Sequence, residues 1–111
     1  MQKWRRVEND ETGISCEIGR LTWRQRPLIA AMIAETFAPI AQIQTAGDPS
    51  GGDIALALRK AVETLDEAIL KPILDTKVRK VQGLEGVSTG AQLFDEAPDL
   101  RFILWLLNQL V

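Results

Sequence analysis

The sequence predicts a mainly α fold: a small helical domain of three to four helices with an N-terminal β-hairpin. Two observations carry this expectation. In long segments of the chain, apolar residues recur at the three- and four-residue spacing of a helix face. Near the N-terminus, two short runs flank a turn-rich stretch, and the second alternates apolar with polar residues as a strand does. A chain of 111 residues has the size of a single domain, 1–111.

The hairpin is expected within residues 2–18. Ile14, Cys16 and Ile18 alternate with polar residues, and the stretch 9–13 is rich in residues suited to tight turns. Because two short strands are only marginally stable alone, the hairpin needs a helix to pack against.

The first helix is expected over 22–46. Thr22 and Gln25 match a capping box, in which the hydroxyl accepts a hydrogen bond from the N–H of residue 25 and the glutamine side chain reaches back. Pro39 has no backbone N–H and crowds the preceding turn, so we expect the helix either to end there or to be kinked there and continue.

A loop and a second helix follow. The stretch 45–53 has a loop composition, and Ser50 with Asp53 is a second capping-box candidate. The second helix is expected over 53–82, with a kink or a break at Pro72 because proline disrupts the helical hydrogen bonds.

An apolar stripe at helical spacing runs along this second helix. Its members are Ile54, Leu58, Val62, Leu65, Ile69 and Ile73. On the opposite face, Arg59 and Glu63 are placed for an i,i+4 ion pair, as are Glu67 and Lys71. The basic stretch 77–80 is expected in the last helical turn, where positive charge is favourable.

The last helix is expected over 96–111, after a loop at 83–90. From Phe102 to Leu107 every residue is large and apolar, so no rotation hides all of them in a two-layer domain. Leaving about four of them exposed would forgo about 6–12 kcal/mol of burial. Either other elements enclose this helix on several sides, or part of it forms an interface with another protein or another copy.

The chain lacks side chains that most catalytic and metal sites need. It has no histidine, which removes the usual general base and the commonest zinc ligand. Its glycine-rich stretches do not match nucleotide-binding motifs. Cys16 lies on the apolar side of the expected strand, which favours a small buried thiol over a reactive one. We therefore expect a protein that is not an enzyme, with no catalytic residue, no cofactor and no metal.

The net charge of −2 argues against nucleic acid as the main partner, because binding phosphates needs a concentrated positive surface. Two basic clusters stand out, Arg20–Arg26 around Trp23 and Lys77–Lys80. For the first, packing of Trp23 at the start of the helix is favoured over a nucleic-acid contact. No signal peptide or membrane span is recognisable, so the cytoplasm is the expected location, without membrane contact.

The segment Leu21–Gln25 reads Leu-Thr-Trp-Arg-Gln and opens an alanine-rich stretch, 28–37, that is followed by Ala38-Pro39-Ile40. This opening and its Pro-Ile ending resemble the tail assembly chaperones of long-tailed bacteriophages, over about a quarter of the chain. The resemblance implies a mostly α-helical, self-associating protein of the host cytoplasm. It also implies that the protein binds the tape measure protein, covers its apolar helical surface and has no catalytic residues.

The leading hypothesis is therefore a phage or prophage tail assembly chaperone that binds amphipathic helices of a tape measure protein. The partner-binding residues are predicted to be Ile29, Met32, Ile33, Phe37, Phe102, Trp105, Leu106 and Val111. One alternative is a structural virion component, such as a head–tail connector or tail completion protein. The other is a small DNA-binding regulator. For the leading hypothesis we expect a homo-oligomer.

Overall fold

The computed structural model describes residues 3–45 and 51–111. These residues form five helices and a three-stranded antiparallel sheet. The elements are β1 (Arg5–Glu8), β2 (Ser15–Ile18), α1 (Gln25–Thr45), α2 (Gly51–Thr64), α3 (Glu67–Lys77), β3 (Val78–Gln82), α4 (Gly90–Glu96) and α5 (Leu100–Leu110). The predicted fold class, three to four helices with a hairpin, is therefore wrong.

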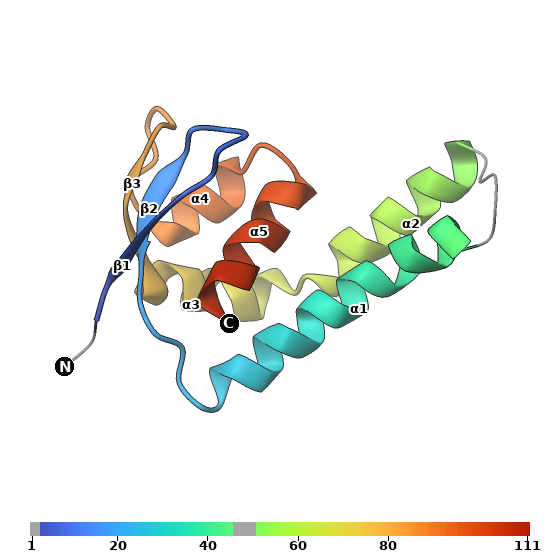
Figure 1. Ribbon diagram of the computed structural model, residues 1–111, viewed down its shortest axis with the longest axis horizontal. Helices are drawn as coiled ribbons and strands as arrows, with labels where there is room; N and C mark the ends of the chain where they lie inside the picture. The colour runs from blue at the N-terminus through green and yellow to red at the C-terminus, as the bar shows by residue number, and fades with distance from the viewer. Residues whose placement is uncertain (1–2, 46–50) are drawn as a thin grey trace.

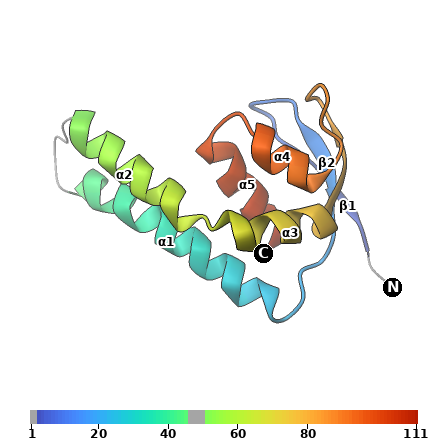
Figure 2. The ribbon, with the colours of Figure 1, turned by 180° about the vertical axis from the view of Figure 1, so that it is seen from behind.

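The molecule consists of a body and an arm (Figure 1). In the body, α3, α4 and α5 lie against the sheet, whose strand order is β1-β2-β3. The arm is the antiparallel helix pair α1–α2, which extends away from the body and gives the protein dimensions of 48 × 32 × 23 Å (Figures 1 and 2). The first half of α1 packs against the body and contacts α5, so the arm is attached along its base.

The β1–β2 hairpin is present within the predicted range. Its strands pair antiparallel, with Val7 opposite Cys16, and the side chains of Ile14, Cys16 and Ile18 are buried as their alternation predicts. The side-chain oxygen of Asn9 holds the turn by accepting hydrogen bonds from the backbone N–H groups of the two residues 11 and 12.

The third strand replaces what was predicted as the last turn of a helix. Val78–Gln82 pairs antiparallel with β2, and Val78 and Val81 are buried. Between two of the pairs, β3 has one residue more than β2, which is a β-bulge. Lys80 has a φ of 52° at this point, in the left-handed region that an extra residue in a strand can adopt.

Helix α1 begins at the predicted capping box. The N–H of Gln25 donates to the Thr22 hydroxyl at 3.2 Å, and the N–H of Thr22 donates to the Gln25 side chain at 3.0 Å. The helix continues past Pro39 to Thr45. The second capping-box candidate, at Ser50, lies outside the described residues.

The single helix predicted over 53–82 is instead two helices and a strand. The break falls at Leu65–Asp66 and not at Pro72, which lies inside α3. Asp66 causes the restart, because its side chain caps α3 by accepting from the N–H of Ala68 at 3.0 Å. Both predicted i,i+4 ion pairs are present, one on each side of the break.

Two short capped helices occupy the C-terminal part of the chain. α4 lies at residues 90–96, after the predicted loop, and begins with a capping box between Thr89 and Gln92. α5 begins at Leu100 and not at 96, because Asp99 caps it by accepting from the N–H of Phe102 at 2.9 Å.

The core lies between the sheet and the helices, and it includes the base of the arm. Its fully buried apolar side chains come from α1, α3, β2, β3, α4 and α5: Ile29, Leu70, Leu74, Cys16, Val78, Leu93, Phe102, Leu106 and Leu107. α5 has six buried residues around most of its circumference. This supports the alternative in which other elements of the same chain enclose the helix on several sides. Trp105, on α5, is partly exposed, and Val111, just after the end of the helix, is exposed.

The buried thiol of Cys16 gives a testable pH dependence. Burial raises its pKa from 9.0 to about 11, although the nearby Arg6 guanidinium opposes the shift. Because the folded protein favours the protonated thiol, this group contributes stability below pH 9 that is lost as the pH rises towards 11. We expect a disulfide reagent near neutral pH to react with the native thiol at least about a hundredfold more slowly than with the unfolded chain. Rapid labelling of the native protein would contradict the burial of this thiol. In a separate measurement of stability against pH, Cys16→Ser should remove the part of the alkaline decline that the thiol causes.

Candidate functional site

A cleft of about 490 Å³ lies between the arm and the body. Its three walls are the hairpin turn 9–12, the exposed side of α5 between 101 and 108, and Phe37 on α1. Its volume falls in the range of ligand-binding clefts in proteins, about 300–1,000 Å³. The cleft is the place where elements far apart in the sequence meet around partly exposed aromatic side chains.

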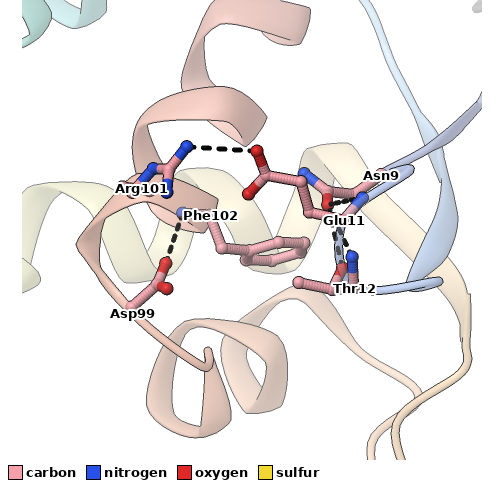
Figure 3. Close-up of polar contacts among 6 residues, drawn as sticks. All are labelled: Asn9, Glu11, Thr12, Asp99, Arg101 and Phe102. Atoms are coloured by element: carbon pink, nitrogen blue, oxygen red, sulfur yellow. Dashed lines mark hydrogen bonds and ion pairs between the residues drawn. The ribbon is translucent and has the colours of Figure 1, made fainter.

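The hairpin turn forms a well-ordered wall. Asn9 is buried, and its Oδ1 accepts from the N–H groups of Glu11 and Thr12 at 3.1 and 3.0 Å and from the Thr12 hydroxyl at 3.1 Å (Figure 3). These three hydrogen bonds fix the turn from inside. Asp10 and Glu11 therefore stand at the rim of the cleft with exposed carboxylates.

The first turns of α5 form the opposite part of the body wall. Asp99 caps the helix, and the Phe102 ring points from α5 towards the hairpin turn (Figure 3). The Phe102 and Trp105 rings pack in a tilted arrangement with their centroids 5.5 Å apart. Arg101 donates to Glu11 at 3.1 Å across the two walls, although both side chains are exposed, so the ion pair adds little stability.

The arm contributes Phe37 to the cleft. Its side chain is 43% exposed, whereas the preceding Thr36 is fully buried and donates its hydroxyl to the carbonyl of Met32 at 2.7 Å. Since Thr36, Met32 and Ile29 face inwards, Phe37 is held on the side of α1 that borders the cleft. An exposed phenylalanine beside a second aromatic residue is a surface that can bind an apolar side chain of a partner.

The structure divides the eight predicted partner-binding residues into two groups. Ile29, Met32, Phe102 and Leu106 are buried in the core, so their main role here is to hold the fold. Ile33 and Trp105 are half-buried, and Phe37 and Val111 are exposed. Phe37, Phe102 and Trp105 meet in the cleft, whereas Val111 borders a separate small recess near Lys3 and Arg5.

Sequence reasoning missed an exposed apolar surface on α2. Ile54, Leu58 and Val62, three members of the predicted apolar stripe, are 45–56% exposed. The α2 residues that pack inwards are Ala57 and Ala61, which are buried. The Ala57–Ala61 spacing was the available signal, because small residues four apart allow two helices to approach closely. We call Ile54, Leu58 and Val62 the α2 stripe.

The two basic clusters lie in different surroundings. Arg79 and Lys80 lie at 2.9 and 3.8 Å from the carboxylate of Glu17, and Arg79 also stacks on Trp4. Trp23 is 76% exposed with Arg24 over its ring, so the predicted packing of Trp23 at the start of α1 is wrong. The pairing with Glu17 makes Arg79 and Lys80 a weak phosphate-binding surface. Arg20 and Arg26 instead line the small recess that also includes Lys3 and Arg5.

No group of three or more histidine, cysteine or carboxylate side chains is arranged to hold a metal ion in residues 3–45 and 51–111. In the same part of the chain, no helix is both long and apolar enough to cross a membrane.

Comparison with protein-family models gives no match for this chain, and comparisons with curated proteins and with solved structures also give none.

Proposed function

We propose that the protein is a non-enzymatic tail assembly chaperone of a phage or prophage, which binds apolar helical segments of a tape measure protein. The observation that carries this proposal is the aromatic cleft, in which the 43%-exposed Phe37 on the arm borders the same space as Trp105 on the body. Leaving a phenylalanine at the surface forgoes burial free energy that a partner can supply. The resemblance in the segment Leu21–Gln25 supplies the class of partner.

An amphipathic helix is the form of partner that suits this cleft. A helix binds in a groove by inserting apolar side chains three, four or seven residues apart, while its polar face stays in water. Phe37 and Trp105 provide the apolar surface for such anchors. At the rim, Glu11 pairs with Arg101, whereas Asp10 forms no ion pair with another described residue. A basic residue beside the anchors of the partner helix would therefore be favourable at this side.

The α2 stripe extends the apolar surface available on the arm. Each of its side chains is about half exposed and lies one helical turn from the next. A chaperone that keeps a long, helical client soluble benefits from several weak apolar contacts, because linked contacts raise the overall affinity without a single tight site.

The test is co-expression with successive segments of a candidate tape measure protein. We expect at least one amphipathic segment to become soluble and to co-purify with the chaperone, because its apolar face is covered. A segment of equal length and charge with its apolar anchors replaced by serine is the control. The proposal fails if no segment gains solubility or co-purifies, or if the chain is present in stoichiometric amount in finished virions, as expected of a structural component.

A further inference from the structure

β1 forms an open edge of the sheet. The strand order is β1-β2-β3, so one side of Arg5–Glu8 has no neighbouring strand among the described residues (Figure 1). The opposite edge, β3, is partly covered, because Arg79 bridges to Thr89 and the N–H of Val81 donates to the carbonyl of Ser88 at 3.4 Å. An open edge strand presents unpaired backbone groups that can join another strand.

The pairing with β2 determines which backbone groups of β1 face outwards. The N–H of Asn9 donates to the carbonyl of Ile14 at 2.8 Å, which makes these opposite residues a hydrogen-bonded pair. Hydrogen-bonded and non-hydrogen-bonded pairs alternate along an antiparallel ladder. Val7 and Arg5 therefore bond to β2, whereas Arg6 and Glu8 direct their N–H and C=O groups to the open edge.

The side chains of the same residues give this edge a self-complementary pattern. Arg6 and Glu8 are exposed on the outer face of the sheet, where Arg6 contacts Ser15 and Gln82, and Val7 lies on the buried face. We propose that two copies of the chain pair antiparallel through β1, with Arg6 of each copy opposite Glu8 of the other. The chaperone hypothesis also expects a homo-oligomer, but the β1 interface is inferred from the strand geometry and charges alone.

One register satisfies both the backbone and the charges. Residues facing each other across an antiparallel edge must both point their backbone groups at the partner. Within β1, Arg6 can therefore face only Arg6 or Glu8 of a second copy. If Arg6 faced Arg6 of the second copy, two positive charges would lie together. Pairing centred on Glu8 would likewise bring two negative charges together. Pairing centred on Val7 places Arg6 opposite Glu8 twice, forms four backbone hydrogen bonds and brings the two Val7 side chains together.

The existing contacts of Arg6 are compatible with this pairing. Its guanidinium donates to Ser15 at 2.8 Å and to Gln82 at 2.6 Å from a single nitrogen. The three remaining N–H donors of the guanidinium group, on Nε and Nη1, can reach a carboxylate. The resulting two-fold interface is small, so the association should depend on protein concentration in the micromolar range or above.

The experiment is sedimentation equilibrium of the full chain, from low micromolar to near-millimolar concentration. We expect the wild type to shift from 12.3 kDa towards twice this mass. Arg6→Glu and Glu8→Arg, each alone, should weaken the dimer at least about tenfold, because two attractive pairs become repulsive. Arg5→Glu, one residue away with its backbone bonded to β2, is the matched control and should retain the dimer.

Mixing the two charge variants separates pairing from folding. In a mixture of Arg6→Glu with Glu8→Arg, the new acid of one chain faces the new base of the other, and the unchanged Glu8 and Arg6 also face each other. The mixture should therefore regain the affinity of the wild type, although the contacts of Arg6 with Ser15 and Gln82 stay lost in one chain. A wild type that remains monomeric, a dimer indifferent to Arg6→Glu, or a mixture that stays monomeric would each overturn the proposal.

Discussion

Gly90→Ala is expected to lower the free energy of unfolding by more than about 3 kcal/mol, because the new methyl group has no space. Gly90 is the first residue of α4, and an added Cβ would overlap the backbone carbonyl of Leu74 on α3. Neither helix can move freely, since the Leu74 carbonyl also accepts from the N–H of Val78, where α3 ends and β3 begins. Relief of the overlap therefore disturbs the junction of α3, α4 and the sheet.

The measurement is urea unfolding followed by circular dichroism, with Gly86→Ala as the matched control. Gly86 lies in the same connection and has a φ of 77°, but an added Cβ would meet no atom within 4 Å. Its substitution should cost only the left-handed backbone penalty, about 1–2 kcal/mol. Equal stabilities of the two variants would show that α3 and α4 do not pack as closely as described.

The helix that begins at Gly90 also shows where sequence reasoning stopped short. The glycines at 83, 86 and 90 predicted a loop by composition, and the first two do adopt positive φ in a turn. Gly90 has a different role, since it is required for close helix packing, which composition does not distinguish from a turn. The local signal for α4 was present, because Thr89 and Gln92 match the same capping box that correctly placed the start of α1.

β3 was not recognisable from its own residues. Lys77–Lys80 carries three basic residues, a pattern that is favourable in the last turn of a helix, and the preceding residues are helical. What makes Val78–Gln82 a strand is pairing with β2, about sixty residues earlier in the chain, together with a bulge at Lys80. A bulge shifts the alternation of buried and exposed side chains, so Val78 and Val81 do not show the period of two that identifies a strand.

The candidate cleft was predictable in part. The sequence identified segments too apolar to be ordinary surface helices, and Phe37 and Trp105 come from those two segments. It did not identify which side of each segment stays exposed, because that depends on how α1 and α5 cross and on where the hairpin turn lies. For the same reason Ile29 and Leu106 were predicted at the binding surface, although both are fully buried.

Phe37→Asp is expected to weaken binding of a co-purifying tape measure segment by at least about thirtyfold, because truncating an aromatic anchor at a binding site commonly costs about 2 kcal/mol or more. The aspartate would also place a negative charge beside the Asp10 and Glu11 carboxylates at the rim, where an apolar anchor of the partner should lie. The dissociation constant is measured by isothermal titration calorimetry with the purified segment.

Loss of binding must be separated from loss of the fold, and the arm provides a matched control for this purpose. Leu56 on α2 is 52% exposed, compared with 43% for Phe37, and it does not border the cleft. Leu56→Asp introduces the same charge on the same arm, so both variants should unfold within about 1 kcal/mol of the wild type. Only Phe37→Asp should lose the segment. If both variants bind like the wild type, the cleft is not the binding site; if both lose binding equally, the partner binds the arm as a whole, and the specific role proposed for Phe37 is wrong.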